Sequence, residues 1–338
     1  MDSEFHYYLT YFLAREAELP EHHARILSCA SSYPDNALVA YRILTDRGEY
    51  RSLATHHLGF WDKSQEWESW IPFHFVPGDP HVSAGRRRDG RVHPLAVSEN
   101  GRHVRTLLIE ALKTRNLYRV GVALHAFADS YAHQDFTGTR DDFNSTGSRS
   151  LIPPIGHAQY LSSPDKFEEV WTDERLISSA ATIRNRERFL RAAAKIFGYL
   201  WLFRHGGRSI HEDKRAFAME RIRWILDDLG ADAGRADRLL HWQLEESIPA
   251  YDRNAWKNEA IVTSKLPEDV DLASAYDKLL WIKNEFLHKT RIIAEQPVPA
   301  RPGFHESHFY KWMKAAASHK KLALSVLSKL KTETAGRA

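Results

Sequence analysis

The sequence predicts an all-α protein, a multi-helix bundle with two long loops over one end. Apolar residues recur at helical spacing through most of the chain, and the strict alternation typical of strands is scarce. Two irregular stretches, 71–100 and 135–166, interrupt the helical pattern. Loops of this length inside a compact domain are usually functional or mobile. We therefore expect functional residues both on the helices and in these loops.

The helical pattern begins near the N-terminus and recurs to the end of the chain. Residues 3–18 place Phe5, Leu9, Phe12 and Leu13 at helical spacing before Pro20 interrupts them. Further helices are expected at 21–32, at 36–47 before Gly48, and twice within 103–134 with a break near Asn116. Later helical patterns cover 167–204, 209–229, 234–247, 271–296 and 306–331. We interpret residues 1–338 as one domain, with a site-bearing core over 1–207 and an additional helical layer over 208–338.

The composition allows a full hydrophobic core and narrows the classes of function. Of 338 residues, 43% are hydrophobic and 27% are charged, as in ordinary globular proteins. The single cysteine, Cys29, excludes an intramolecular disulfide and a cysteine-based zinc finger. A net charge of +3 is too small to indicate a nucleic-acid partner. No stretch resembles a secretory leader or a transmembrane helix, so we expect a soluble, cytoplasmic protein.

Three side chains able to bind a metal share one register, because His125, Asp129 and His133 follow one another at intervals of four residues. On a helix, such a step turns about 40° past a full turn and rises about 6 Å. His125 and Asp129 can hold one ion between them, whereas His133 is better placed for a neighbouring ion. A carboxylate in the middle of such a stripe can bridge two metal ions.

The residues around this stripe indicate a buried helix, since Val122, Leu124, Phe127 and Ala128 are apolar. A buried, unpaired carboxylate is costly, and a metal ion is one good compensation. A hydrogen-bonded polar stripe in the core, or a helix face that meets solvent, would explain the same pattern.

The stripe, followed by Gly156 and His157, resembles the zinc-dependent phospholipase C family and the related zinc-dependent single-strand nucleases. The phrases EFHYYLTYFLA, IPFHFVPGD, VALHAFADSYAHQDF and IGHAQYLSSPD also look like a soluble subgroup of that superfamily, over roughly residues 1–175. The resemblance implies a helical bundle with a three-zinc cluster at one end.

Carried onto this chain, the resemblance implies three ion positions. The first would be held by Asp35, His74, His125 and Asp129. The second would be held by His133 and His157, and the third by His6 with Asp129 as a bridge. Structural roles would also explain some of these residues: Asp35 could cap a helix and His6 could be a hydrogen-bonded core histidine.

Two positions depart from the family pattern. In the family, the amino group of the first residue of the processed chain binds metal; here no processing is evident, so Met1 is not expected to do so and Glu4 could supply an oxygen instead. The late His-x3-Glu of the family is broken, because Leu161 stands four residues after His157. Asp165 is the best replacement, although it could equally be a turn residue after Pro164.

The expected cofactor is zinc, as two or three ions. Histidine and aspartate donors without thiolate also suit iron or manganese, so the choice of zinc depends on the family resemblance. Neighbouring metal ions lower the pKa of a bound water and neutralise charge in a phosphoryl transition state. We therefore expect a metal-dependent hydrolase of phosphoesters or phosphodiesters on a small anionic substrate, with Asp35 as the candidate general base. Arg86, Arg87, Arg88 and Arg91 could orient such an anion, although a solvated loop also explains them.

Two other functions remain open at this point. The cluster could perform amide hydrolysis or metal-assisted oxidation on a small intracellular metabolite. Di-iron bundles need Glu-x-x-His on two helices, and the sequence offers one plausible instance, Glu285 to His288. Alternatively, a closed metal site could only support the fold.

Overall fold

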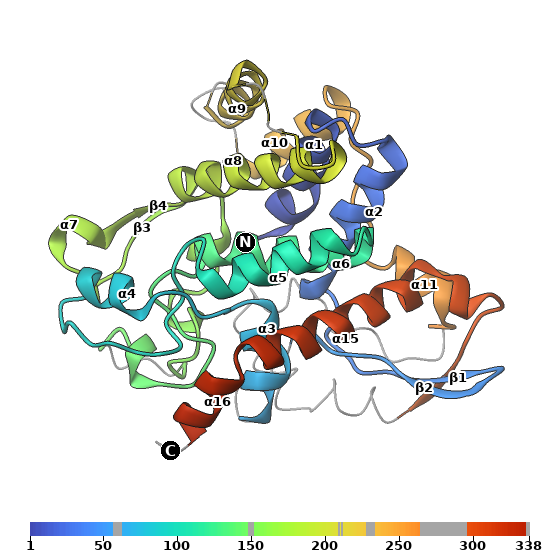
Figure 1. Cartoon of the computed structure of the whole chain (residues 1–338), viewed down its shortest axis with the longest axis horizontal. Coiled ribbons are helices and arrows are strands. Elements are labelled where there is room, and N and C mark those ends of the chain that lie inside the picture. Colours follow the sequence, from blue (N-terminus) through green and yellow to red (C-terminus); the bar gives the residue numbers. More distant parts are fainter. Residues whose placement is uncertain are drawn as a thin grey trace.

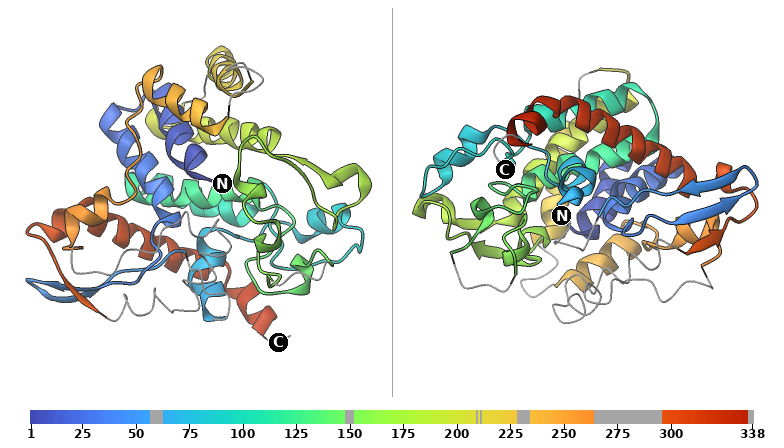
Figure 2. Two further views of the ribbon diagram at one scale, coloured as in Figure 1. Left: turned by 180° about the vertical axis from the view of Figure 1, so that it is seen from behind. Right: turned by 90° about the horizontal axis from the view of Figure 1, so that it is seen from below.

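The computed structural model describes residues 1–56, 63–147, 152–208, 210, 212–227, 234–263 and 296–335. Most of the elements in these residues are helices, as predicted, and two small sheets accompany them. Figures 1 and 2 show the helices around a central one, with the amino terminus near the middle of the molecule.

The central element is α6 (Leu117–Ala132), which is buried along its length from Val120 to Ala132. It packs against α2 (Glu21–Ser32), α5 (Arg102–Lys113), α8 (Asn185–Arg204) and α15 (His308–Val326). Asn116 separates α5 from α6 as predicted, because its side chain accepts hydrogen bonds from the backbone N–H groups of Tyr118 and Arg119. Gly121 allows α2 to approach closely: a Cβ there would lie 2.4 Å from Cβ of Ala30.

Two short π-helices lie in the amino-terminal part of the chain. The first, η1 (Glu4–Leu9), continues into α1 (Thr10–Glu16) and includes His6. The second, η3 (Glu66–Trp70), leads through α3 (Ile71–Phe73) to His74. π-helical turns are rare and occur often at functional sites. Here each one lies in a segment that contains a predicted metal-binding histidine.

The predicted helix over 36–47 is wrong. After the short turn η2 (Tyr33–Asp35), the chain forms a hairpin of β1 (Arg42–Thr45) and β2 (Gly48–Arg51), in which Thr45 pairs with Gly48. Gly48 has φ +108°, so the glycine that suggested a helix end belongs to the hairpin turn. Strand β5 (Pro297–Pro299) pairs with β1 in parallel, and this contact is too distant in sequence for local periodicity to reveal.

The predicted helix over 167–204 is confirmed only in its second part, α8. The first part contains β3 (Val170–Thr172), α7 (Ser178–Ala181) and β4 (Thr182–Arg184), with β3 and β4 paired antiparallel. The two predicted loops contain only short elements: α3 and α4 (Pro80–Arg86) in the first, and η4 (Asp142–Asn144), η5 (Ala158–Tyr160) and η6 (Ser163–Asp165) in the second.

The carboxy-terminal part forms α9 (Glu212–Asp227), α10 (Arg235–Leu244), α11 (Ala255–Ala260), η7 (Phe304–Glu306), α15 and α16 (Ser328–Ala335). Ile222 and Trp242 belong to the same hydrophobic core cluster as Leu13 and Phe127, so this layer packs on the site-bearing helices. The predicted helix over 271–296, with the Glu285 to His288 pair, lies outside the described residues except for position 296.

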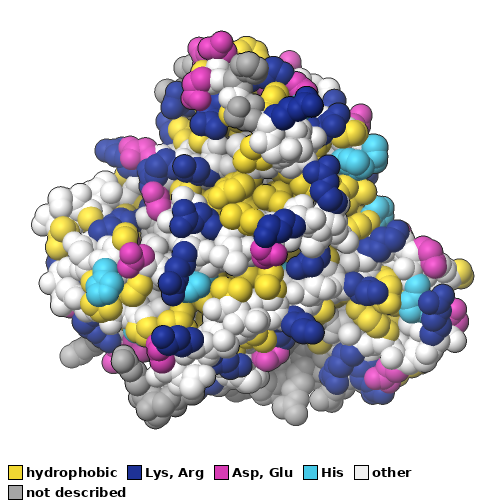
Figure 3. All heavy atoms as spheres, viewed as in Figure 1, with side chains coloured by type: hydrophobic (Ala, Val, Ile, Leu, Met, Phe, Trp, Pro, Cys, Tyr) yellow, Lys and Arg dark blue, Asp and Glu magenta, His cyan; other side chains and the backbone are white. Residues whose placement is uncertain are grey.

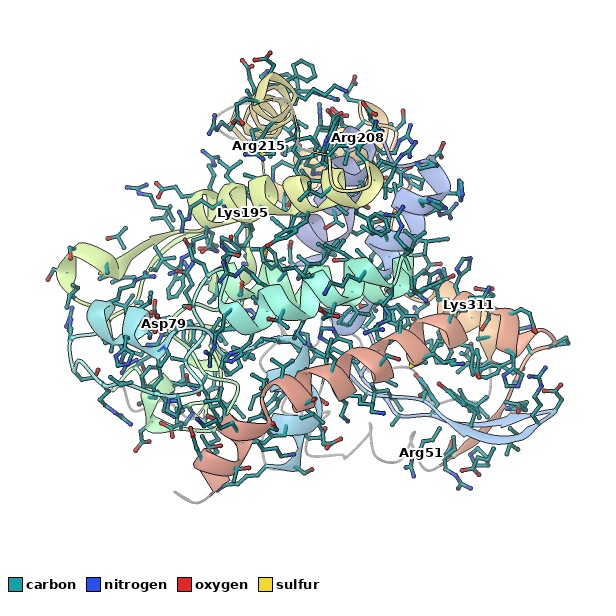
Figure 4. The ribbon with its side chains drawn as sticks, in the orientation of Figure 1. Arg51, Asp79, Lys195, Arg208, Arg215 and Lys311 are labelled. Carbon is teal, nitrogen blue, oxygen red and sulfur yellow. The ribbon has the colours of Figure 1, made fainter. Side chains whose placement is uncertain are left out.

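The surface does not concentrate charge of one sign on the face shown in Figure 3, where basic and acidic side chains are interspersed. A hollow between α8 and α9 is lined by Ala194, Tyr199, Leu202 and Ile210, together with Lys195 and Arg215, which are labelled in Figure 4. Among the described helices, none is long and apolar enough to cross a bilayer.

Candidate metal centre

The site is built on the last two turns of α6, where His125 and Asp129 lie on the helix and His133 forms its C-cap. All three side chains are buried, and Asp129 is only 1% exposed. The two oxygens of Asp129 face different partners. Oδ1 lies 3.1 Å from Nε2 of His6, whereas Oδ2 lies 3.2 Å from both Nε2 of His125 and Nδ1 of His74.

The first group of donor atoms consists of Asp35, His74 and His125. Oδ1 of Asp35 lies 3.6 Å from Nε2 of His125 and 3.7 Å from Nδ1 of His74, and these two nitrogens are 3.0 Å apart. Asp35 ends η2 directly after α2, and its side chain is 17% exposed. It is therefore the most accessible member of this group.

The second group consists of His6, His125 and Asp129. The imidazole rings of His6 and His125 stack with centroids 3.9 Å apart. The α-amino group of Met1 lies beside this group, 2.6 Å from Oδ1 of Asp129 and 3.0 Å from Oδ1 of Asp165. Met1 was not expected to bind metal, yet the structure places its amino group beside these donor atoms.

The third group consists of His133, His157 and Asp165. Nε2 of His133 is 3.0 Å from Oδ1 of Asp165, and Nε2 of His157 is 3.3 Å from Oδ2. Asp165 thus lies between both histidines. Leu161, which cannot coordinate through its side chain, accepts a hydrogen bond from Nδ1 of His157 through its carbonyl oxygen at 2.8 Å.

Backbone carbonyls orient four of the five imidazoles. Thr55 O lies 3.0 Å from Nε2 of His74, and Ser31 O lies 2.8 Å from Nδ1 of His125. The carbonyl oxygen of His74 lies 2.8 Å from Nδ1 of His133, and the carbonyl oxygen of Leu161 lies 2.8 Å from Nδ1 of His157. An N–H that donates to a carbonyl leaves the opposite ring nitrogen with its lone pair toward the cluster. Metal-binding histidines typically show this arrangement.

The three carboxylates are held in their ionised form. Burial raises the pKa of Asp129, but the Met1 ammonium and the nearby imidazoles of His133 and His125 outweigh burial and hold that pKa well below its usual range. Burial is likewise outweighed at Asp165, chiefly by the Met1 ammonium and His157, so its pKa is also lowered. The pKa of Asp35 is lowered chiefly by His125 and His56 against burial.

Burial lowers the pKa of His6, His74 and His157 and favours their neutral form, the form that binds metal. Burial lowers the pKa of His6 to about 4, with a further contribution from His125. Burial also lowers the pKa of His74 to about 4, despite the Asp129 carboxylate beside it. The pKa of His125 is raised, because Asp129 and Asp35 outweigh its burial.

These distances fit divalent cations. A tetrahedral ion with bonds of about 2.0–2.1 Å to nitrogen and oxygen separates its ligand atoms by about 3.4 Å. Within the three groups, histidine nitrogens and aspartate oxygens in contact lie 3.0 to 3.7 Å apart. Buried carboxylates close to one another also require positive charge. In the described residues, the first two groups share His125. The third is joined to them because Oδ2 of Asp129 lies 3.8 Å from Nδ1 of His133 and the amino group of Met1 contacts both Asp129 and Asp165.

Glu4 is not part of this cluster, contrary to prediction. Its carboxylate accepts two hydrogen bonds from Arg238, at 2.7 and 3.0 Å. Residues two apart on a helix do not face each other, so Glu4 cannot join His6 at the same site. The separation of two residues between Glu4 and His6 could therefore have excluded Glu4 from the sequence alone.

His56 is a residue that the sequence analysis missed. Its Nδ1 lies 3.7 Å from Oδ1 of Asp35, and its ring meets that of His74 edge to face at 5.0 Å. The side chain is 28% exposed, so it lies on the accessible side of Asp35. No motif singled it out, because it follows the irregular stretch after β2.

The arginines of the first loop have structural partners. Arg86 donates to Gln134 and lies 3.3 Å from Asp135, Arg87 binds Asp89 and the carbonyl of Phe143, and Arg88 donates to the carbonyl of Leu176. Arg91 lies 3.8 Å from Asp141. These contacts tie the two loops and the β3–β4 region together, which accounts for the arginines without a substrate.

The chain was compared with known families and proteins. A family of unknown function, DUF6765, corresponds to residues 1–327. No curated protein and no solved structure matches the chain.

Proposed function

The chain belongs to the family DUF6765, and we propose that it is a metal-dependent hydrolase of phosphoesters. The observation that supports this best is the position of Asp129, whose two oxygens face two different groups of donor atoms. A bridging carboxylate places metal ions a few ångströms apart, the arrangement used by many phosphoesterases. The same arrangement favours the zinc-dependent phospholipase C type of bundle, with zinc as the leading candidate metal.

The proposed ligands divide into three positions. Asp35, His74, His125 and Asp129 would hold one ion, and His133, His157 and Asp165 a second. His6, Asp129 and the amino group of Met1 would hold a third, and the amino group would first have to lose the proton that it carries beside Asp129 and Asp165. Ions at these positions would supply an acidified water and neutralise charge that develops on a phosphoryl group.

Asp35 would have a second task beside its contact with the first ion. It is the most accessible carboxylate of the cluster, and it is ionised. An ionised carboxylate at the mouth of the site can accept a proton from the attacking water. His56 would hold Asp35 in place from the solvent side.

The charge of the loaded site favours an anionic substrate. Asp35, Asp129 and Asp165 are the carboxylates in the three groups of donor atoms. Two or three divalent ions exceed their negative charge, so the loaded site would be positive overall. A small phosphoester or phosphodiester fits such a site better than a neutral amide does.

Elemental analysis of protein purified without added metal is the first test, followed by hydrolysis of bis(4-nitrophenyl) phosphate with and without a chelator. We expect at least two equivalents of metal and chelator-sensitive hydrolysis. Asp35→Asn should lower kcat by about 10² to 10⁴, the range typical of a lost general base. Asp173→Asn is the matched control, because Asp173 is a buried carboxylate bound to Arg175 outside the cluster. Protein without metal would contradict the proposal.

A structural metal is the second candidate, because Asp129, His6 and His125 are almost completely buried. A closed site would hold metal but hydrolyse neither phosphodiesters nor phosphomonoesters, and Asp35→Asn would then lower only stability. The partial exposure of Asp35 and His157 favours the catalytic alternative, since a catalytic site keeps an open position.

A further inference from the structure

Helix α10 contacts the first residues of the chain through a buried arginine. Arg238 donates from Nε and Nη2 to the two carboxylate oxygens of Glu4, and Nη2 also lies 2.7 Å from Glu168. Trp242, one turn further along α10, directs its indole N–H toward the same carboxylate at 3.4 Å. Arg238 and Glu4 are both buried, and this two-point contact fixes the direction of the Glu4 side chain.

A second arginine of α10 holds the residues before Glu4. Nε of Arg235 lies 2.9 Å from Oδ2 of Asp2, and Nη2 lies 3.1 Å from Oγ of Ser3. Figure 1 shows α10 next to the amino-terminal helices, and α10 packs directly on η1. The first turn of the chain is therefore fastened to a helix more than 230 residues away in sequence.

The anchored residues lie between two residues that face the cluster. Asp2 and Glu4 point toward α10, whereas the amino group of Met1 and the ring of His6 face Asp129. The backbone N–H of Asp2 also donates to the carbonyl of Asp165 at 3.1 Å. Because one short segment makes both sets of contacts, its position on the α10 side determines how far Met1 and His6 reach on the other.

We propose that Arg238, assisted by Arg235, is a positioning residue that acts through Glu4 to hold Met1 and His6 at the cluster. The carboxy-terminal layer thereby determines the occupancy of one ion position, the one shared by Met1, His6 and Asp129. This proposal rests on the proposed metal cluster but not on any particular reaction. It also gives a role to residues after 208, which contain no motif of their own.

The test uses the full chain with Arg238→Gln and two readouts. The first is the metal content of the purified protein. The second is the rate at which an amine-acylating reagent modifies Met1, followed by mass spectrometry of the amino-terminal peptide. We expect Arg238→Gln to lose one metal equivalent and to expose an amino group that is protected in the wild type. Arg238→Lys should restore only part of both, because an ammonium cannot make the paired contact of a guanidinium.

Arg221→Gln is the matched control. Arg221 also joins the carboxy-terminal layer to two carboxylates, Glu16 and Glu246, but it contacts none of the first six residues. Metal content and protection of Met1 should not change in this variant. Equal losses in the Arg221 and Arg238 variants would overturn the proposal, since they would indicate a general loss of stability.

Arg235→Gln covers the case in which Arg238→Gln does not fold. Arg235 is partly exposed, and we expect the same two changes at a smaller size. A folded Arg238→Gln with full metal content and a protected Met1 would also overturn the proposal. Wild-type protein without metal would contradict the proposed function and the role of Arg238 in ion occupancy. The acylation of Met1 would still test whether Arg238 holds the amino terminus at Asp129.

Discussion

The two ends of the cluster are built differently. At one end, Asp35, His125 and Asp129 come from regular helices or their last turns, and their partners are deeply buried. At the other end, His157 and Asp165 come from the irregular stretch between Asp135 and Lys166, and only His133 belongs to a helix end. The helical end depends on packing between helices. The loop end depends on a few backbone conformations.

The loop end differs from the helical end in containing unfavourable backbone conformations. Leu161, whose carbonyl orients His157, has φ +54° although it is not a glycine. Gly156 has φ +48°, and a Cβ at this position would lie 2.5 Å from Cζ of Phe75. The ring of Phe75 in turn stacks on His133 with centroids 4.6 Å apart. Unusual backbone conformations of this kind cluster at functional sites, so we expect the loop end to be the more easily disturbed.

The largest expected effect separates the two ends by metal content. Asp129→Ala should remove more than one equivalent, because its two oxygens face two groups of donor atoms, whereas His157→Ala should remove only one. Elemental analysis of the folded variants measures the difference, with Asp173→Ala as the control. Loss of one equivalent or none from Asp129→Ala would rule out the bridging role, and equal losses from both variants would remove the distinction between the ends.

A smaller effect is expected at Gly156 in the loop end. Gly156→Ala combines an unfavourable positive φ with a contact on the Phe75 ring, and should lower the free energy of unfolding by about 3 kcal/mol. It should also weaken metal binding at His133 and His157, because Phe75 must move from His133. Denaturant titration and metal content test both effects.

Gly90→Ala is the control for Gly156→Ala. Gly90 has φ +60°, but no atom lies near the position of an added Cβ. Gly90→Ala should therefore lower the free energy of unfolding only through the unfavourable backbone conformation, by about 1 kcal/mol. If both variants lost the same stability and neither lost metal, the packing of Phe75 on His133 would have no part in the site.

The difference between the ends also explains what the sequence could predict. The stripe of His125, Asp129 and His133 follows from helical periodicity, which is local, and the structure places all three at the cluster. The amino group of Met1 faces the donor atoms, whereas Glu4 pairs with Arg238 on α10, and this contact is too remote in sequence for the residues to reveal. The hairpin over 42–51 was missed because its second neighbour, β5, lies in a remote part of the chain.

The positions of Asp165 and His157 were predicted from a resemblance to a motif, not from physical spacing. Nothing local in the sequence shows that Leu161 turns its carbonyl toward His157. Irregular segments of this kind can be predicted from sequence only when a known pattern guides the prediction. At the helical end, His125 and Asp129 could be predicted from the residues alone, whereas Asp35 was also predicted from the resemblance.

The smallest expected effect concerns the support of the helical end by α15. His319 on α15 lies 3.0 Å from the carbonyl of Pro72, stacks on Phe73 and is buried, so it supports the turn that leads to His74. Burial lowers the pKa of His319 to about 4. Between pH 6.5 and 4 the unfolded chain therefore binds a proton at this residue that the folded chain does not, and acid lowers the free energy of unfolding.

His319→Gln keeps a donor for Pro72 but cannot titrate in this range. In metal-free protein, lowering the pH from 7 to 5 should cost the wild type about 2 kcal/mol more than the variant. Denaturant titration at both pH values measures this difference, and His81→Gln, at an exposed histidine of α4, should behave as the wild type does. Identical pH dependence in wild type and His319→Gln would mean that the His319 imidazole takes up its proton in the folded protein as readily as in the unfolded chain. A buried neutral histidine would then have no part in the support that α15 gives to the helical end.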